Sequence, residues 1–131
     1  MNLPQDLLYT KQHEWLRVVD DGANAVVGIT DYAQAELDEL VYVEVETVGE
    51  ELDADEVFGT VEAVKTTSDL FMPVGGKVLE FNEALSEDGG DNPGLINEDP
   101  YGAGWIVKIA LADPASVASL LSAEAYGELI G

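Results

Sequence analysis

Short apolar runs, separated by turn-forming residues, constrain the fold of this chain more than any other feature. Val41–Glu46 alternates apolar and acidic side chains, which is the two-residue period of a strand with one buried face. Many short strands between Gly-rich turns predict a compact β barrel or sandwich, with residues 1–131 forming a single domain. The other expected strands are Trp15–Val19, Ala25–Ile29, Val57–Val61, Asp69–Val74, Lys77–Asn82 and Gly104–Ala110.

Helix signals flank these strands. Thr30 is a candidate N-cap for a short helix over Asp31–Leu37, and the acid in its first turn suits the positive end of the helix dipole. The pair Asp113-Pro114 predicts the start of a helix with Val117, Leu120 and Leu121 on one face, because proline is favoured in a first helical turn. Ser122 is the candidate cap of a last helical segment near the end of the chain.

The charge balance excludes several classes of partner. Five Lys and Arg residues against 27 Asp and Glu residues give a net charge of −22. Nucleic-acid binding needs clustered cations, and the same negative field opposes docking on an anionic membrane. The acids are spread along the chain, which favours adaptation to concentrated salt, where the Debye length falls to about 3 Å. A docking surface for a basic partner is the alternative explanation.

Cellular context is indicated by what the chain lacks. No run approaches the roughly 18 apolar residues of a membrane span. The first residues have neither the basic start nor the apolar stretch of a signal peptide. The absence of cysteine excludes disulfides and thiolate chemistry. These observations predict a soluble, cytoplasmic protein.

Lys65 is a cation in a chain almost without cations, and it lies between two expected strands, at a hairpin tip. A lysine amine at such a tip can be acylated, which removes its charge. A nucleophilic lysine needs a desolvated pocket or a neighbouring cation, whereas the neighbours Glu62 and Asp69 are acidic. We therefore interpret Lys65 as the attachment point of a mobile cofactor, with an ordinary surface lysine as the alternative.

Other catalytic and metal-binding patterns are missing. His13 is the only histidine, and in a chain without cysteine it is a weak metal signal, so a partly buried, hydrogen-bonded imidazole is expected. The acidic loop Glu87–Asn92 does not have the spacing of a calcium loop. Because no catalytic triad or phosphate-binding loop occurs either, we predict a cofactor carrier, not an enzyme, with no catalytic or metal-binding residues.

Four segments together resemble the H proteins of the glycine cleavage system. The likeness covers nearly the whole chain, including the C-terminal helical region. It implies a mainly β fold, a lipoyl-type barrel-sandwich hybrid with short flanking helices, and lipoate in amide linkage on Lys65. The segments are Tyr9–Trp15, Val27–Gln34, Val57–Leu70 and Leu95–Trp105.

The resemblance also implies a function. Such proteins carry an aminomethyl group from a pyridoxal-phosphate glycine decarboxylase (P protein) to an aminomethyltransferase (T protein), and a dihydrolipoyl dehydrogenase (L protein) reoxidises the lipoyl group. A lipoate-attaching enzyme is a further implied partner. The loaded arm is held in a surface cleft, and the matching positions here are Glu14 and Asp69, whose carboxylates suit a cationic amine.

The chain departs from this family pattern at several turns. Leu37-Asp38-Glu39 stands where Leu-Gly-Asp is usual, and Gln12 replaces a smaller residue found in many members. Two lipoyl-bearing alternatives stay open: a lipoyl donor or relay protein, and a lipoyl domain of another 2-oxo-acid dehydrogenase-type complex. Biotin carriers typically have methionine on both sides of the modified lysine, whereas this chain has Val64 and Thr66.

Overall fold

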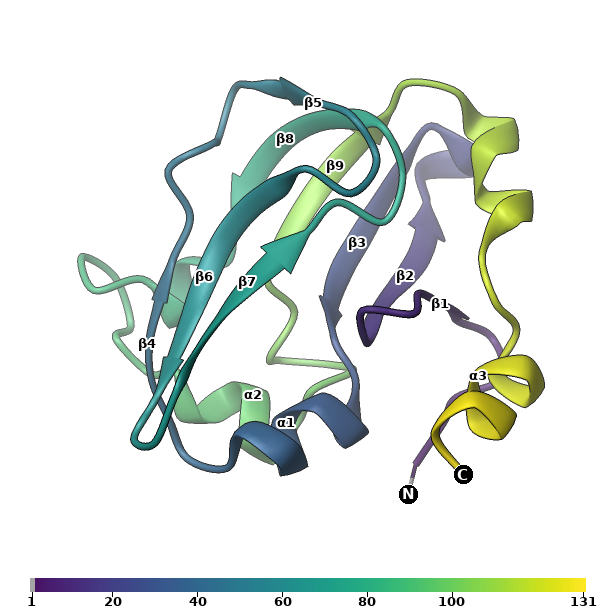
Figure 1. Ribbon diagram of the computed structural model, residues 1–131. Helices are drawn as coiled ribbons and strands as arrows, with labels where there is room; N and C mark the ends of the chain where they lie inside the picture. Colours follow the sequence, from purple (N-terminus) through teal and green to yellow (C-terminus); the bar gives the residue numbers. More distant parts are fainter. Residues whose placement is uncertain (1) are drawn as a thin grey trace.

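The computed structural model describes residues 2–131, which form two antiparallel sheets (Figure 1). The larger sheet has the strand order β1-β2-β3-β9-β8-β5, and the smaller has the order β4-β6-β7. The predicted mainly β architecture is thereby confirmed. The strands are β1 (Leu8–Tyr9), β2 (Glu14–Val19), β3 (Asn24–Ile29), β4 (Leu40–Glu44), β5 (Glu51–Leu52), β6 (Val57–Ala63), β7 (Thr67–Phe71), β8 (Gly76–Phe81) and β9 (Val107–Leu111).

Three short α-helices accompany the sheets. In Figure 1, α1 (Asp31–Leu37) and α2 (Gly94–Glu98) lie beside the free end of the β6–β7 hairpin, while α3 (Ala123–Ile130) lies beside the chain termini. Three 3₁₀ segments, Asp20–Gly22, Glu83–Leu85 and Pro114–Ser119, join other elements. Within residues 2–131, no helix is long and apolar enough to cross a membrane.

Apolar side chains from both sheets form the main core. Val27 and Ile109 from the larger sheet, and Phe58 and Val61 from the smaller one, are at most 1% exposed and belong to one cluster. Each such side chain stabilises the fold by roughly 1.5–3 kcal/mol relative to an exposed one. The alternation predicted at the start of β4 fails at Val41, which is 44% exposed, because an irregularity between Leu40 and Tyr42 shifts the pleat there.

The β6–β7 hairpin places Lys65 at its tip, as predicted. Glu62 pairs with Thr67 in the last rung, and the Ala63 amide donates a 2.7 Å hydrogen bond to the Thr66 carbonyl. The next amide, that of Val64, donates at 3.0 Å to the carbonyl of Glu39 in the α1–β4 connection. The backbone is thus anchored to a second element one residue before Lys65.

Asn97 of α2 fixes that connection. Its Oδ1 accepts a hydrogen bond from the Leu40 amide at 3.1 Å, and its Nδ2 donates to the Asp38 carbonyl at 2.7 Å and to Gln34 Oε1 at 2.9 Å. The predicted helix over Asp31–Leu37 is confirmed with the same bounds, because the Thr30 side chain caps the Ala33 amide. One amide side chain therefore ties α1, α2 and β4 together beneath the hairpin tip.

The C-terminal region differs from the prediction in one respect. Ser122 caps α3 as expected, through a 3.1 Å hydrogen bond from the Ala125 amide. The segment after Asp113, however, is a 3₁₀ helix that ends at Ser119, because Leu120 is extended and Leu121 forms a β-bridge with Tyr9. A continuous helix through Leu121 would forfeit that bridge.

Asp38, which ends α1, adopts φ 66° and ψ −139°, a region that glycine tolerates far better than any residue with a Cβ. We expect Asp38→Gly to raise the free energy of unfolding by about 1 kcal/mol, since relief of this strain exceeds the added entropy of the unfolded chain. Urea unfolding measures the change. Asp38→Asn is the control, because it removes the charge but keeps the Cβ; an equal gain in both variants would assign the effect to charge.

Candidate functional site

The Lys65 side chain is exposed at the hairpin tip. Thr66 and Thr67 are exposed beside it, and Val64 is 71% exposed. The one ion pair found among residues 2–131 joins Lys108 to Asp20 at 3.1 Å, so no described carboxylate holds the Lys65 amine. The amine is therefore accessible from solvent without unfolding of any element.

A cleft of about 290 Å³ lies between α1, the β1–β2 turn and the β6–β7 hairpin. Ile29, Val61 and Leu70 give it an apolar floor, and all three are at most 3% exposed. Both carboxylates singled out in the sequence line it, whereas Lys65 lies outside it at the tip of the hairpin that forms one wall. The complete lining is Gln12, His13, Glu14, Ile29, Tyr32, Ala33, Glu36, Leu37, Val61, Ser68, Asp69 and Leu70.

Glu14 is a buried carboxyl group, only 2% exposed, at the start of β2. Its Oε2 accepts a 3.0 Å hydrogen bond from the Phe71 amide, and its Oε1 lies 3.1 Å from the Thr10 hydroxyl. Burial raises the pKa of Glu14 to about 8, with a smaller upward contribution from Asp55, although both hydrogen bonds act in the opposite direction. The raised pKa of Glu14 favours its protonated form at neutral pH.

Asp69 differs from Glu14 in its surroundings. It lies on β7, opposite Thr60 of β6, and its side chain is exposed at the cleft. The structure therefore brings together the two predicted residues as one buried and one solvated carboxyl group.

His13 is partly buried, as predicted, and adopts φ 70° in the β1–β2 turn. Its Nδ1 lies 2.8 Å from the Tyr126 hydroxyl, which is also 2.8 Å from Thr30 Oγ1. Burial lowers the pKa of His13, with an opposing contribution from Glu36. This network attaches α3 to the cleft wall, and sequence reasoning missed it because 113 residues separate its outer members.

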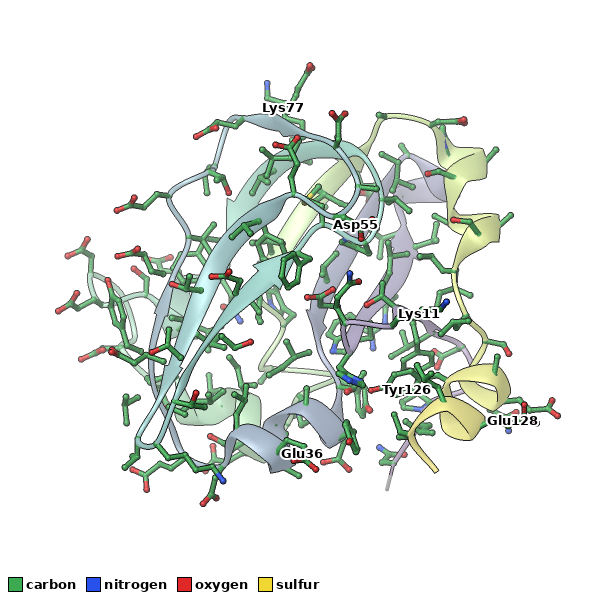
Figure 2. All side chains as sticks on the ribbon, in the orientation of Figure 1. Lys11, Glu36, Asp55, Lys77, Tyr126 and Glu128 are labelled. Carbon is green, nitrogen blue, oxygen red and sulfur yellow. The ribbon has the colours of Figure 1, made fainter. Side chains whose placement is uncertain are left out.

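Asp55 is a second residue that sequence reasoning missed. It lies in the connection before β6 at φ 70°, and its Oδ1 accepts a 3.3 Å hydrogen bond from Gln12 Nε2. Figure 2 shows Asp55, Glu36 and Tyr126 projecting from three different parts of the chain. Asp55 hydrogen-bonds to Gln12, Tyr126 hydrogen-bonds to His13, and Glu36 acts electrostatically on His13. The sequence around Asp55, from Asp53 to Glu56, shows only turn-forming and acidic residues, which do not indicate a site.

Metal binding has no support in the part of the chain that the structure describes. Within residues 2–131, no group of three or more His, Asp or Glu side chains is arranged to hold an ion. The acidic loop Glu87–Asn92 is included in that range.

Comparisons with known proteins agree on one family. The family model described as "Glycine cleavage H-protein" matches residues 7–131. The chain is similar to the glycine cleavage system H protein of Chlorobium luteolum, with 58% identity over 131 residues, covering 100% of this chain and 99% of the relative. It is also similar to the glycine cleavage system H protein of Bacteroides thetaiotaomicron, with 55% identity over 130 residues, covering 99% of this chain and 98% of the relative. The crystal structure of such a protein from Mycobacterium marinum has a TM-score of 0.85 at 38% identity, covering 98% of each chain.

Proposed function

The chain belongs to the glycine cleavage H-protein family, and on that premise we propose that Lys65 is the residue that carries its lipoyl group. Members of this family are non-catalytic lipoyl carriers of the glycine cleavage system, with lipoate bound covalently to a lysine. Their partners are the P, T and L proteins and a lipoate-attaching enzyme. The chain is therefore a carrier protein and not an enzyme.

The position of Lys65 is the observation that carries the assignment. Its amine is exposed on an anchored hairpin tip, and the same hairpin forms a wall of the cleft that contains Glu14 and Asp69. A bound lipoyl group supplies a dithiolane that accepts electrons and holds the aminomethyl cargo. The residues present fit such a group, because an apolar floor suits its hydrocarbon arm and carboxyl groups suit a cationic amine.

We assign distinct tasks to the cleft residues. Ile29, Val61 and Leu70 exclude water from the inner end, and a drier site strengthens electrostatic interactions within it. Glu14 receives the amine at depth, and Asp69 attracts it at the exposed side. Holding the cargo amine away from water slows its loss by hydrolysis.

We further propose that residues 1–131 act as a single domain.

Intact mass with peptide mapping, on protein from its native host grown on glycine, tests the Lys65 assignment. One lipoyl group is expected on the peptide containing Lys65, and none on peptides containing Lys11, Lys77 or Lys108. A biotinyl group, an unmodified Lys65, or lipoate on another lysine would contradict the assignment.

Glu14→Gln should release the loaded aminomethyl group roughly ten- to a hundredfold faster than wild type, because a charge-assisted hydrogen bond contributes about 1.5–3 kcal/mol. Asp69→Asn should accelerate the loss only about two- to threefold, since exposed ion pairs contribute less than 1 kcal/mol. Formaldehyde release from fully lipoylated, loaded protein measures both rates. Unchanged retention in Glu14→Gln, with lipoylation complete by mass, would remove Glu14 from the binding site.

We also propose that the net charge of −22 is an adaptation to a cytoplasm with concentrated salt. Transfer from molar KCl to dilute buffer should lower the Tm by roughly 10 °C or more, because repulsion among the carboxylates is no longer screened. Thermal unfolding followed by circular dichroism measures the shift, with the Bacteroides thetaiotaomicron relative as the comparison protein. Equal Tm values in the two buffers would favour a docking role for the acids.

A further inference from the structure

Glu14 combines burial with the absence of any cation to balance its charge. It is 2% exposed, and the only ion pair among residues 2–131 lies elsewhere, between Lys108 and Asp20. Its two hydrogen-bond partners, the Phe71 amide and the Thr10 hydroxyl, are neutral. A buried carboxylate with only neutral partners is unfavourable unless it takes up a proton or gains a cation.

The groups around Glu14 do not supply that cation. From β7 comes Asp69, from the connection before β6 comes Asp55, and from α1 comes Glu36, all acidic. Asp55 acts directly on Glu14 and raises the pKa of that carboxyl, in addition to the larger effect of burial. The other titratable groups on the nearby elements are His13, Lys11, Tyr32 and Tyr126.

Neither basic residue of the β1–β2 turn compensates Glu14. His13 has a lowered pKa, and its Nδ1 hydrogen-bonds to Tyr126, so the imidazole is neutral near pH 7. Lys11 lines a separate cavity that includes Asp55 but not Glu14. The Thr10 hydroxyl, which lies 3.1 Å from Glu14 Oε1, can instead accept a hydrogen bond from a protonated Glu14.

We propose that Glu14 is protonated while no cation occupies the cleft, and that it releases this proton to solvent when the cationic amine of the cargo binds beside it. The proposal rests on the proposed function, because it needs the amine in this cleft. The O–H bond of Glu14 breaks, the proton passes to the buffer, and the amine keeps its own protons, so no electrons are transferred. Retention of the cargo is thereby coupled to pH.

This coupling makes the cleft's preference for a cationic arm over a neutral arm depend on pH. Two permanently charged carboxylates would not give that dependence. A neutral arm finds a neutral, hydrogen-bonded Glu14 and gains no ion pair, whereas a cationic arm gains one. Since proton release accompanies binding, the binding constant of the cationic arm should rise with pH between the pKa of Glu14 in the occupied cleft and its pKa in the empty cleft, by up to about tenfold per pH unit. An uncharged arm should show no such dependence.

Two alkylated forms of the lipoylated protein distinguish the effect of the arm's charge from the effect of its size. Because the chain has no cysteine, the thiols of the reduced lipoyl arm are the only thiols available. Alkylation with (2-bromoethyl)trimethylammonium gives a cation whose charge does not change with pH, and 1-bromo-3,3-dimethylbutane gives its uncharged isostere. Mass spectrometry establishes equal labelling. Carbon-13 NMR of protein labelled at the glutamate side-chain carboxyl then follows the titration, and Glu14→Gln identifies the Glu14 signal.

Unalkylated and neutral-armed protein should show Glu14 titrating near pH 8, and the cationic arm should lower its pKa by about one to three pH units. Titration of Glu14 in the ordinary acidic range without the cation overturns the proposal. Unchanged titration with the cation overturns both the proposal and the binding of the amine in this cleft. The assignment of the lipoyl group to Lys65 is tested separately by peptide mass. Failure of that assignment can therefore be told apart from failure of the Glu14 proposal.

Asp55→Asn provides an independent check on the electrostatics. Asparagine tolerates the positive φ of this position, so the variant removes the charge and keeps the backbone. It should lower the pKa of Glu14 measurably in the unalkylated protein. Glu128→Gln is the matched control, because Glu128 is exposed and projects from α3 away from the cleft (Figure 2). Equal responses of Glu14 to the two variants contradict a specific effect of Asp55.

Discussion

Lys65→Arg should abolish carriage of the aminomethyl group, lowering glycine-dependent turnover with the P, T and L proteins by roughly 10³-fold or more. Arginine keeps the positive charge, but its guanidinium group is not a substrate for amide formation with lipoate. Without the covalent arm, the dithiolane loses its high effective concentration at each partner site. The decarboxylation step can be measured separately. With the P protein and the H-protein variant present, and the T and L proteins left out, exchange of the glycine carboxyl carbon with bicarbonate reports this step.

The control for this variant is Lys77→Arg, which makes the same change at an exposed lysine of β8. It should leave turnover and lipoylation unchanged. Circular dichroism should show both variants folded, since neither side chain is buried. Residual turnover in Lys65→Arg above the level seen without H protein would show that another residue carries the arm.

Glu14→Gln should remove a large pH dependence of stability. Burial raises the pKa of Glu14 to about 8 from an ordinary value of 4.5. Between these values the folded protein keeps a proton that the unfolded chain has lost, so the free energy of unfolding falls as the pH rises. The contribution of Glu14 protonation to the free energy of unfolding is fully present below pH 4.5 and is lost by about pH 8. Its size is of the order of 4–5 kcal/mol.

Glutamine reproduces the hydrogen bonds of the protonated acid, so the variant should keep its stability over the same range. Denaturant unfolding of unlipoylated wild type and variant, at fixed molar KCl from pH 5 to 8.5, measures the difference. The depressed pKa of His13 and the repulsion among the surface acids affect both proteins alike and cancel. A constant difference across this pH range would show that Glu14 is ionised in the folded protein.

Local signals made much of the fold predictable. Thr30 begins α1 and Ser122 begins α3 because each side chain caps its own helix within three residues. The β6–β7 hairpin was predictable because two strand patterns flank a short polar segment. The two-residue strands β1 and β5 were not, because two residues cannot display a period, and the five-residue helix α2 lacks a side-chain cap.

Two residues of the candidate site were predicted from the sequence, but their surroundings were not. The family resemblance identified Glu14 and Asp69, and the cleft contains both. Nothing in the polar stretch around His13 indicated that Glu14 would be buried, since its burial depends on strands from distant parts of the chain. The place of Asp55 near the site could not be predicted either, because 43 residues separate it from its hydrogen-bond partner Gln12.

With Lys65 as the proposed attachment point, the hydrogen bond from the Val64 amide to the Glu39 carbonyl affects how the cleft and the partner enzymes compete for the arm. It fixes the backbone pivot next to Lys65, so the distance from the pivot to the cleft is set by the fold. Return of the arm to the cleft is then a unimolecular equilibrium, independent of protein concentration. Capture by a partner enzyme is bimolecular, so partner concentration determines how the arm divides its time between self-protection and delivery.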